Sequence, residues 1–366
     1  MTDDEENNWY LSALRPTIEH LADEAEAYDE IDDETEESIL ESGVDVLLDE
    51  LARQHDTAIQ EERANRTRMN ASIRQSWGHA LDFLDFFILV NQHARRHIET
   101  MADINEKGEN YQFDALMRLH VRALRVSREV ASLLRAGFAN GAIARWRTLH
   151  EIAAVANVVA EEGEEAGERF LKFKTAKDLF RVQTNYHEYL DGLGFDEIEE
   201  ETVEELKKKT EELTDEFGDD FDDVNGWAVK FVDSDGRVTV TDLIKEGGLK
   251  NYLPFYALAC DAIHAGAKGT LFHLGIHEAD IGGENEILLA GRSDIGFTDP
   301  AQLTAIMLYE TTEALRVLED DEAWQAYWEV YLRSMDRVVS EIADTFWLVD
   351  QLISAGREAE GGPRLG

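Results

Sequence analysis

Proline constrains this chain more than any other residue, because it is almost absent. Only four prolines occur in 366 residues, at Pro16, Pro254, Pro300 and Pro363. A proline inside a helix removes a backbone hydrogen bond and clashes with the preceding turn, so its scarcity leaves long stretches free to be helical. Apolar residues recur at helical spacing through most of these stretches. The sequence therefore predicts an all-α fold, an antiparallel helical bundle.

The exceptions are two short segments that favour strands. Val229–Val232 and Val238–Val240 flank Ser234-Asp235-Gly236, a sequence typical of a tight turn. We therefore expect a possible small β-hairpin insertion there, and a brief strand at Ile287–Ala290.

Three regions follow from the distribution of charge and periodicity. Residues 1–62 form an acidic N-terminal helical extension, with 22 acids against two bases. Residues 63–355 form the helical bundle domain, and residues 356–366 a flexible tail. The helices of the bundle domain are expected at about 72–101, 111–135, 142–160, 165–190, 253–274, 300–318 and 324–355.

The net charge is extreme for a globular chain. The sequence has 78 acids and 35 bases, a formal charge of −43, with an ordinary hydrophobic content of 43%. Such a charge repels itself unless salt screens it, and at molar salt the Debye length is only about 3 Å. We interpret the chain as a halophilic, cytoplasmic protein, with a nucleic-acid mimic as the alternative. MTDDEENN at the N-terminus resembles no signal peptide, and the apolar stretches are too charged to span a bilayer.

One part of the chain reverses this charge pattern. Residues 131–160 contain a single acid, Glu151, and residues 63–147 hold 14 bases against eight acids. Arginines at helical spacing form a patch within residues 118–147 that could bind RNA or another anionic ligand. The alternative is that they pair with the surplus carboxylates. The members of the helical row are Arg118, Arg122, Arg125 and Arg128.

The second arm of the predicted hairpin, 142–160, is apolar on nearly every face and should be buried on more than one side. It nevertheless carries polar and charged residues, which need partners or a wet cavity. The spacing of Arg147, His150 and Glu151 allows all three to share one face. They form either a buried polar clasp or, together with Arg145, a catalytic site.

A second candidate cluster lies in the helix predicted at 253–274 and comprises Tyr256, Asp261 and His264. An acid three residues before a histidine can orient the imidazole and raise its basicity. A metal site shared with His150 and Glu151 is conceivable, but no repeated Glu-x-x-His signature supports it, so neither metal nor cofactor is predicted. The single cysteine, Cys260, excludes an intrachain disulfide.

The segment ARWRTLHEIAAVA at residues 144–156 resembles the signature of an uncharacterised prokaryotic family, the domain-of-unknown-function family 5677. Glu168-Arg169-Phe170-Leu171 and the region from Tyr256 to His264 resemble it as well, so the resemblance covers about residues 113–275. It implies an α-helical domain without an established activity.

A more distant resemblance is to HEPN ribonucleases, which carry an arginine, four to six residues, and then a histidine. Arg145 and His150 have this spacing, although Trp146 stands where that family favours a polar residue. In that family the two residues of both protomers meet at a dimer interface and cleave RNA through the 2′-hydroxyl.

These observations leave three functional hypotheses. The first is a HEPN-like RNA-binding or RNA-cleaving defence or stress protein, which could act as a homodimer and in which Arg145 and Arg147 hold phosphate. His150 would then be the general acid/base and Glu151 would position an arginine. The second is a non-catalytic helical interaction module. The third is a metal-dependent hydrolase using Asp261 and His264.

Overall fold

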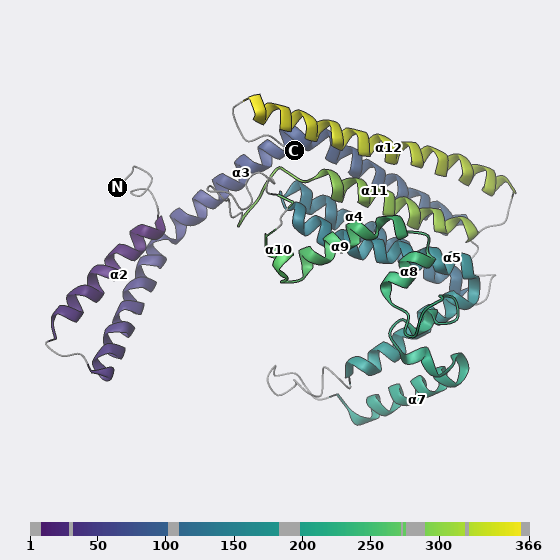
Figure 1. Ribbon diagram of the computed structural model, residues 1–366, viewed down its shortest axis with the longest axis horizontal. Coiled ribbons are helices and arrows are strands. Elements are labelled where there is room, and N and C mark those ends of the chain that lie inside the picture. Colours follow the sequence, from purple (N-terminus) through teal and green to yellow (C-terminus); the bar gives the residue numbers. More distant parts are fainter. Residues whose placement is uncertain are drawn as a thin grey trace. The chain divides into compact units, whose positions relative to one another are not determined.

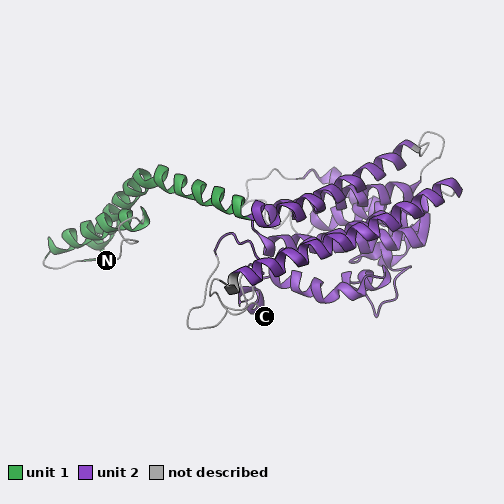
Figure 2. Ribbon diagram, turned by 90° about the horizontal axis from the view of Figure 1, so that it is seen from above, with its two compact units in different colours: residues 1–72 green, residues 73–366 purple. Residues whose placement is uncertain are grey.

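The computed structural model describes residues 9–28, 32–101, 110–182, 198–271, 274–275, 290–318 and 322–359. Within these ranges every regular element is helical. The chain divides into two compact units, residues 1–72 and 73–366, which Figure 2 colours separately. In the described part, no helix combines the length and hydropathy that a bilayer span requires.

The first unit contains α2 (Trp9–Glu26) and the N-terminal part of α3 (Asp33–Met101). The two helices meet where His20 Nε2 lies 2.8 Å from Ser42 Oγ. Leu21 fills the space beside Gly43, where an added Cβ would stand 2.6 Å from Leu21 Cδ2. The sequence predicted a separate helix from residue 72, but α3 continues through this point, because no proline interrupts it.

A helical hairpin forms the centre of the second unit. The first arm, α4 (Tyr111–Arg135), has the predicted bounds and is capped by Asn110, whose side chain accepts a 2.9 Å hydrogen bond from Phe113 N. Gly137 adopts a φ of 82°, and Phe138 N donates to Leu133 O at 2.9 Å, which ends the helix.

The second arm is α5 (Ala139–Arg181). At the far end of the hairpin, the Gln112 side chain donates to the carbonyls of Val159 and Ala160, both at 3.1 Å, so the arms are antiparallel. The helix is kinked at Gly163 (φ 78°, ψ −150°), where the sequence predicted one helix to end and another to begin.

The helical elements formed by residues 198–252 pack on α5. They are α7 (Glu200–Phe217), η2 (Asp219–Asp222), η3 (Gly226–Ala228), α8 (Val240–Glu246) and η4 (Lys250–Tyr252). The predicted β-hairpin does not form. Thr239 and Asp242 make a capping box that starts α8 at Val240, so the last residue of the second expected strand begins a helix instead.

The remaining elements of the second unit are α9 (Leu253–Ile263), α10 (Ala267–Leu271), α11 (Thr298–Glu313), η6 (Ala314–Leu318) and α12 (Glu322–Ala359). The helix predicted at 253–274 breaks at His264, whose backbone is extended (φ −91°, ψ 143°). Gly269 then packs so closely on Asp261 O that a Cβ there would lie 1.9 Å away. The chain must therefore turn back rather than continue the helix.

In Figure 1, α11 lies between the α4–α5 hairpin and α12, and it contacts α4, α5 and α12. Trp77 of α3 packs between Phe297 and Phe346, with ring centroids 5.1 and 5.7 Å away. Its indole nitrogen donates a 2.8 Å hydrogen bond to Asp294 O. Burying aromatic side chains of this size is the main source of stability in such a core.

Two predicted segments fall largely on undescribed residues. The strand expected at 287–290 lies outside the described residues except for Ala290. The expected tail is helical to Ala359, and residues 360–366 also lie outside the described part.

Candidate functional site

Helix α5 is surrounded by other helices, which explains why its sequence is apolar all round. It contacts α4 and α11, and also α7, α8 and α9. Trp146 is fully buried and donates a 3.0 Å hydrogen bond to Leu303 O on α11. The polar residues between 142 and 160 of α5 therefore lie at helix interfaces.

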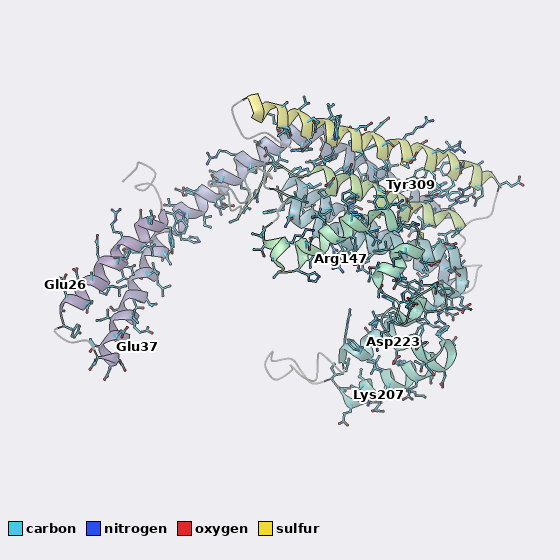
Figure 3. All side chains as sticks on the ribbon, in the orientation of Figure 1. Glu26, Glu37, Arg147, Lys207, Asp223 and Tyr309 are labelled. Atoms are coloured by element: carbon cyan, nitrogen blue, oxygen red, sulfur yellow. The ribbon has the colours of Figure 1, made fainter. Side chains whose placement is uncertain are left out.

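Arg147, Glu151 and Tyr256 form one connected group, which we call the α5–α9 clasp. The hydroxyl of Tyr256 on α9 donates a 2.8 Å hydrogen bond to Glu151 Oε1. Arg147 Nε lies 3.2 Å from the same oxygen, and its guanidinium stands 5.0 Å from the centroid of the Tyr256 ring. Figure 3 labels Arg147. The Arg147 and Glu151 side chains remain 26% and 33% exposed.

The clasp changes the ionisation of its members. Burial, together with the hydrogen bond to Glu151, raises the pKa of Tyr256 to about 12, so the phenol stays neutral and donates. Burial opposes charge on Arg147, but Tyr256 and Glu151 outweigh it and hold the pKa of Arg147 above its usual value. Burial also raises the pKa of the neighbouring Cys260 thiol, which disfavours a nucleophilic thiolate.

His150 is sealed beneath the clasp, with 0% of its surface exposed. Its ring stacks on Trp146 at 5.0 Å and meets the edges of Tyr252 and Tyr256 at 6.2 and 5.6 Å. Neither ring nitrogen makes a hydrogen bond of normal geometry. Burial lowers the pKa of His150 to about 4, and the backbone of Leu249 offsets this only partly. The ring is therefore neutral at pH 7.

Arg145 points away from His150. Five residues along an α-helix turn the side chain by about 140°, so the two cannot face the same way. Arg145 Nε donates to Glu129 on α4, and its Nη1 donates to Thr148 Oγ1 at 3.2 Å. Arg145 therefore binds the first arm of the hairpin, whereas Arg147 binds α9.

The second predicted cluster is divided by the structure. Tyr256 joins the clasp, whereas Asp261 pairs with Lys268 at 2.7 Å. His264 caps the end of α9 and is exposed. No three histidine, cysteine or carboxylate side chains of the described residues are grouped so that they could hold a metal ion.

The arginine row lies on the exposed face of α4, and three of its four members have partners. Arg118 donates two hydrogen bonds to Asp114, and Arg125 Nε lies 3.8 Å from Glu129. Arg128 donates to Gln92. Exposed pairs of this kind contribute about 0–1 kcal/mol each, so they leave the arginines able to exchange partners.

Sequence reasoning missed a second polar contact of α5, formed about two helical turns beyond His150. Asn157 of α5 donates to Gly247 O at 3.0 Å and approaches Glu310 Oε2 at 3.5 Å. Burial raises the pKa of Glu310, and the charge of Glu313 raises it further. The signal was present in the sequence, since Glu310 follows the buried Leu303 and Met307 at helical spacing.

Arg169, in the second family-like segment, has a structural position. It is buried, and it donates to the carbonyls of Trp227 at 2.9 Å, Phe217 at 3.1 Å and Gly226 at 3.4 Å. Burial lowers its pKa. One planar guanidinium thus ties α7 and η3 to α5.

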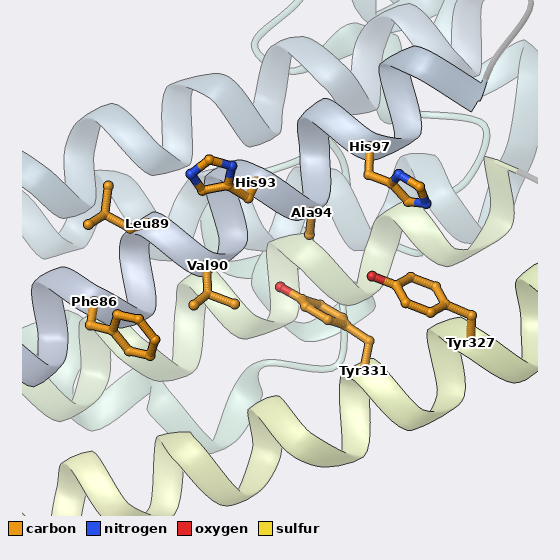
Figure 4. A pocket seen from close by; sticks show the side chains of 8 residues that line it. All are labelled: Phe86, Leu89, Val90, His93, Ala94, His97, Tyr327 and Tyr331. Atoms are coloured by element: carbon orange, nitrogen blue, oxygen red, sulfur yellow. The ribbon is translucent and has the colours of Figure 1, made fainter.

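A separate groove runs between α3 and α12 (Figure 4). It has a volume of about 500 Å³, and none of the predicted site residues lines it. The Tyr331 hydroxyl donates to Asn91 Oδ1 at 3.1 Å, which joins the two helices. The lining residues are Phe86, Leu89, Val90, His93, Ala94, His97, Tyr327 and Tyr331.

Comparison with known proteins gives one match. The model of a family of unknown function, DUF5677, matches residues 113–282, the segment from α4 to beyond α10. No curated protein and no solved structure matches the chain.

Proposed function

Residues 113–282 belong to a family of unknown function (DUF5677), and we propose that this chain is a non-catalytic helical interaction module. One observation carries the proposal: Arg147 and Glu151, two of the side chains that the sequence nominates for catalysis, pair with each other and hold α9 against α5 through Tyr256. His150, the one candidate general base among them, lies sealed beneath this contact.

The clasp is suited to positioning a helix. Its hydrogen bond joins residues 105 positions apart, so it is a tertiary contact rather than a local one. A hydrogen bond to a charged group contributes about 1.5–3 kcal/mol, more than an exposed ion pair. In this role Arg147 pairs with Glu151, and Glu151 accepts the hydrogen bond that orients Tyr256.

The α3–α12 groove supports an interaction role. Its walls are largely apolar and aromatic, and its eight lining residues include no carboxylate although the chain has 78 acids. In the salt-rich interior that the composition predicts, charges act over only about 3 Å, whereas apolar contacts keep their strength. Apolar surfaces would then keep their affinity for a partner, and charges would contribute only where they are in direct contact.

A HEPN-like ribonuclease is the second candidate, and the spacing of Arg145 and His150 favours it. Cleavage requires the imidazole to reach a ribose hydroxyl within about 3 Å. Tyr252 and Tyr256 cover His150, so α9 would have to leave α5 first. The proposed function needs no such opening.

A double-mutant cycle tests the clasp. We expect Glu151→Gln, Tyr256→Phe and the double variant to show a coupling free energy of about 1–2 kcal/mol in urea unfolding. Hydrogen exchange of the α9 amides should accelerate in each single variant. The control is the pair Asp261 and Lys268, whose lysine side chain is 68% exposed, and Asp261→Asn and Lys268→Met should show little coupling. Zero coupling between Glu151 and Tyr256 would contradict the proposal.

A further inference from the structure

The first unit buries very little of itself. Among the described residues of this unit, only Ala13, Thr17, Ile39 and Gly43 are buried. Short helices gain most of their stability from packing an apolar face, and fully burying one isoleucine contributes only about 1.5–3 kcal/mol. The two helices therefore have more apolar surface available than they use on each other.

A regular row of this unused apolar surface lies on α3. Leu40, Val44 and Leu48 follow one another at four-residue spacing and thus share one face of the helix. They are 51%, 49% and 58% exposed. We call these three residues the leucine stripe. On α2, Tyr10, Leu11 and Ile18 are also exposed.

An acidic row runs beside the leucine stripe. Glu41, Asp45 and Asp49 each follow a stripe residue by one position, and all three are exposed. Residues 33–62 contain 11 acids and one base, Arg53. A helix packed on the stripe would lie with its flanks against carboxylates, as at the flanking positions of a coiled coil.

We propose that the leucine stripe binds an amphipathic helix of a partner protein whose apolar face is flanked by lysine or arginine. The apolar residues supply affinity, and the acidic row selects a basic partner and its register. A second copy of this chain is the poorer occupant, because it would bring two acidic rows together and like charges across a helix pair are destabilising. The inference is independent of the α5–α9 clasp.

The test uses the full-length chain and two synthetic amphipathic helical peptides. Both peptides have identical leucines on their apolar face. One peptide has lysine at its remaining positions and the other has glutamate. Fluorescence anisotropy should show the lysine peptide binding at least about tenfold more tightly than the glutamate peptide. The combined variant Leu40→Gln, Val44→Gln and Leu48→Gln should lose at least about tenfold in affinity. The control variant Val330→Gln with Leu352→Gln, which alters exposed apolar residues of α12, should bind as the wild type does.

A second variant covers the case in which the first fails to fold. The combined variant Glu41→Gln, Asp45→Asn and Asp49→Asn leaves the stripe intact. It should reduce the ratio of the affinities for the lysine and glutamate peptides by at least about threefold. Equal binding of the lysine peptide by the wild type and a folded stripe variant would overturn the proposal, because it would show adsorption to negative charge alone. A dimer of the full chain that disappears with the stripe variant would also overturn it, in favour of a second copy as the occupant.

Discussion

The hydroxyl of Tyr256 donates a 2.8 Å hydrogen bond to Glu151 Oε1, and this bond fastens α9 to α5. Removing the hydroxyl alone isolates its contribution. We expect Tyr256→Phe to lower the free energy of unfolding by about 1–2 kcal/mol, because the ring still packs on His150 while Glu151 loses a donor. Urea unfolding measures this. The exposed Tyr327→Phe should change stability by less than about 0.5 kcal/mol, and equal effects of the two substitutions would exclude a clasp.

His150 should make the protein sensitive to mild acid. Its pKa is about 4 in the folded chain and 6.5 as the ordinary value. As the pH falls below 6.5, the unfolded chain therefore binds the proton first, and the folded state loses stability until pH 4. Across that window the loss attributable to His150 is about 3 kcal/mol.

The variant His150→Phe removes this dependence while keeping a ring against Trp146. At pH 7 its free energy of unfolding should lie within about 1 kcal/mol of the wild type, because both ring nitrogens lack partners. Urea unfolding between pH 7 and pH 5 should show that the free energy of unfolding decreases less in the variant than in the wild type as the pH falls. Burial lowers the pKa of His120 to about 3. Its contribution to the pH dependence is the same in both proteins and cancels in the comparison. Parallel pH profiles would mean that His150 is not buried in solution.

Arg169→Lys should destabilise the fold despite conserving charge. The guanidinium serves three backbone carbonyls in a fixed geometry that an ammonium cannot reproduce. Leaving buried carbonyls unpaired should cost at least about 2 kcal/mol. Thermal unfolding measures this, with Lys208→Arg on the exposed face of α7 as the control. A melting temperature equal to that of the control would contradict the structural role.

Gly247→Ala tests the close approach of α8 to α5. A Cβ at this position would stand 2.7 Å from Ala154 O, and backbone atoms cannot move aside cheaply. We expect a loss of about 1–3 kcal/mol in the free energy of unfolding. Gly266→Ala, where an added Cβ meets nothing within 4 Å, should be nearly neutral. Similar losses in the free energy of unfolding for the two variants would show that Gly247 and Ala154 are not in close contact.

Local sequence signals predicted the helices well where their ends are chemically marked. The cap residue Asn110 and Gly137 bound α4, and Gly163 marks the kink of α5. The β-hairpin was wrong because a capping box at Thr239 competes with strand formation. The helix expected at 253–274 breaks at His264, since the close packing of Gly269 on Asp261 is a tertiary constraint.

The candidate site was predictable only in part. The i, i+4 spacing places Arg147 beside Glu151, and the apolar sequence of α5 indicates that such groups need partners. That Tyr256 is the partner depends on the packing of α9, which no local pattern encodes. The same packing decides that His150 is covered. The HEPN-like spacing of Arg145 and His150 stays a prediction, although the structure directs these side chains to different helices.

The account depends on His150 being a covered, structural residue rather than a general acid/base. The most direct measurement compares purified wild type and His150→Phe for cleavage of single-stranded RNA, with the melting temperature of both proteins recorded. We predict no cleavage that depends on His150, together with stability profiles that diverge below pH 6.5. RNA cleavage by the wild type that disappears in an equally stable His150→Phe variant would contradict the account.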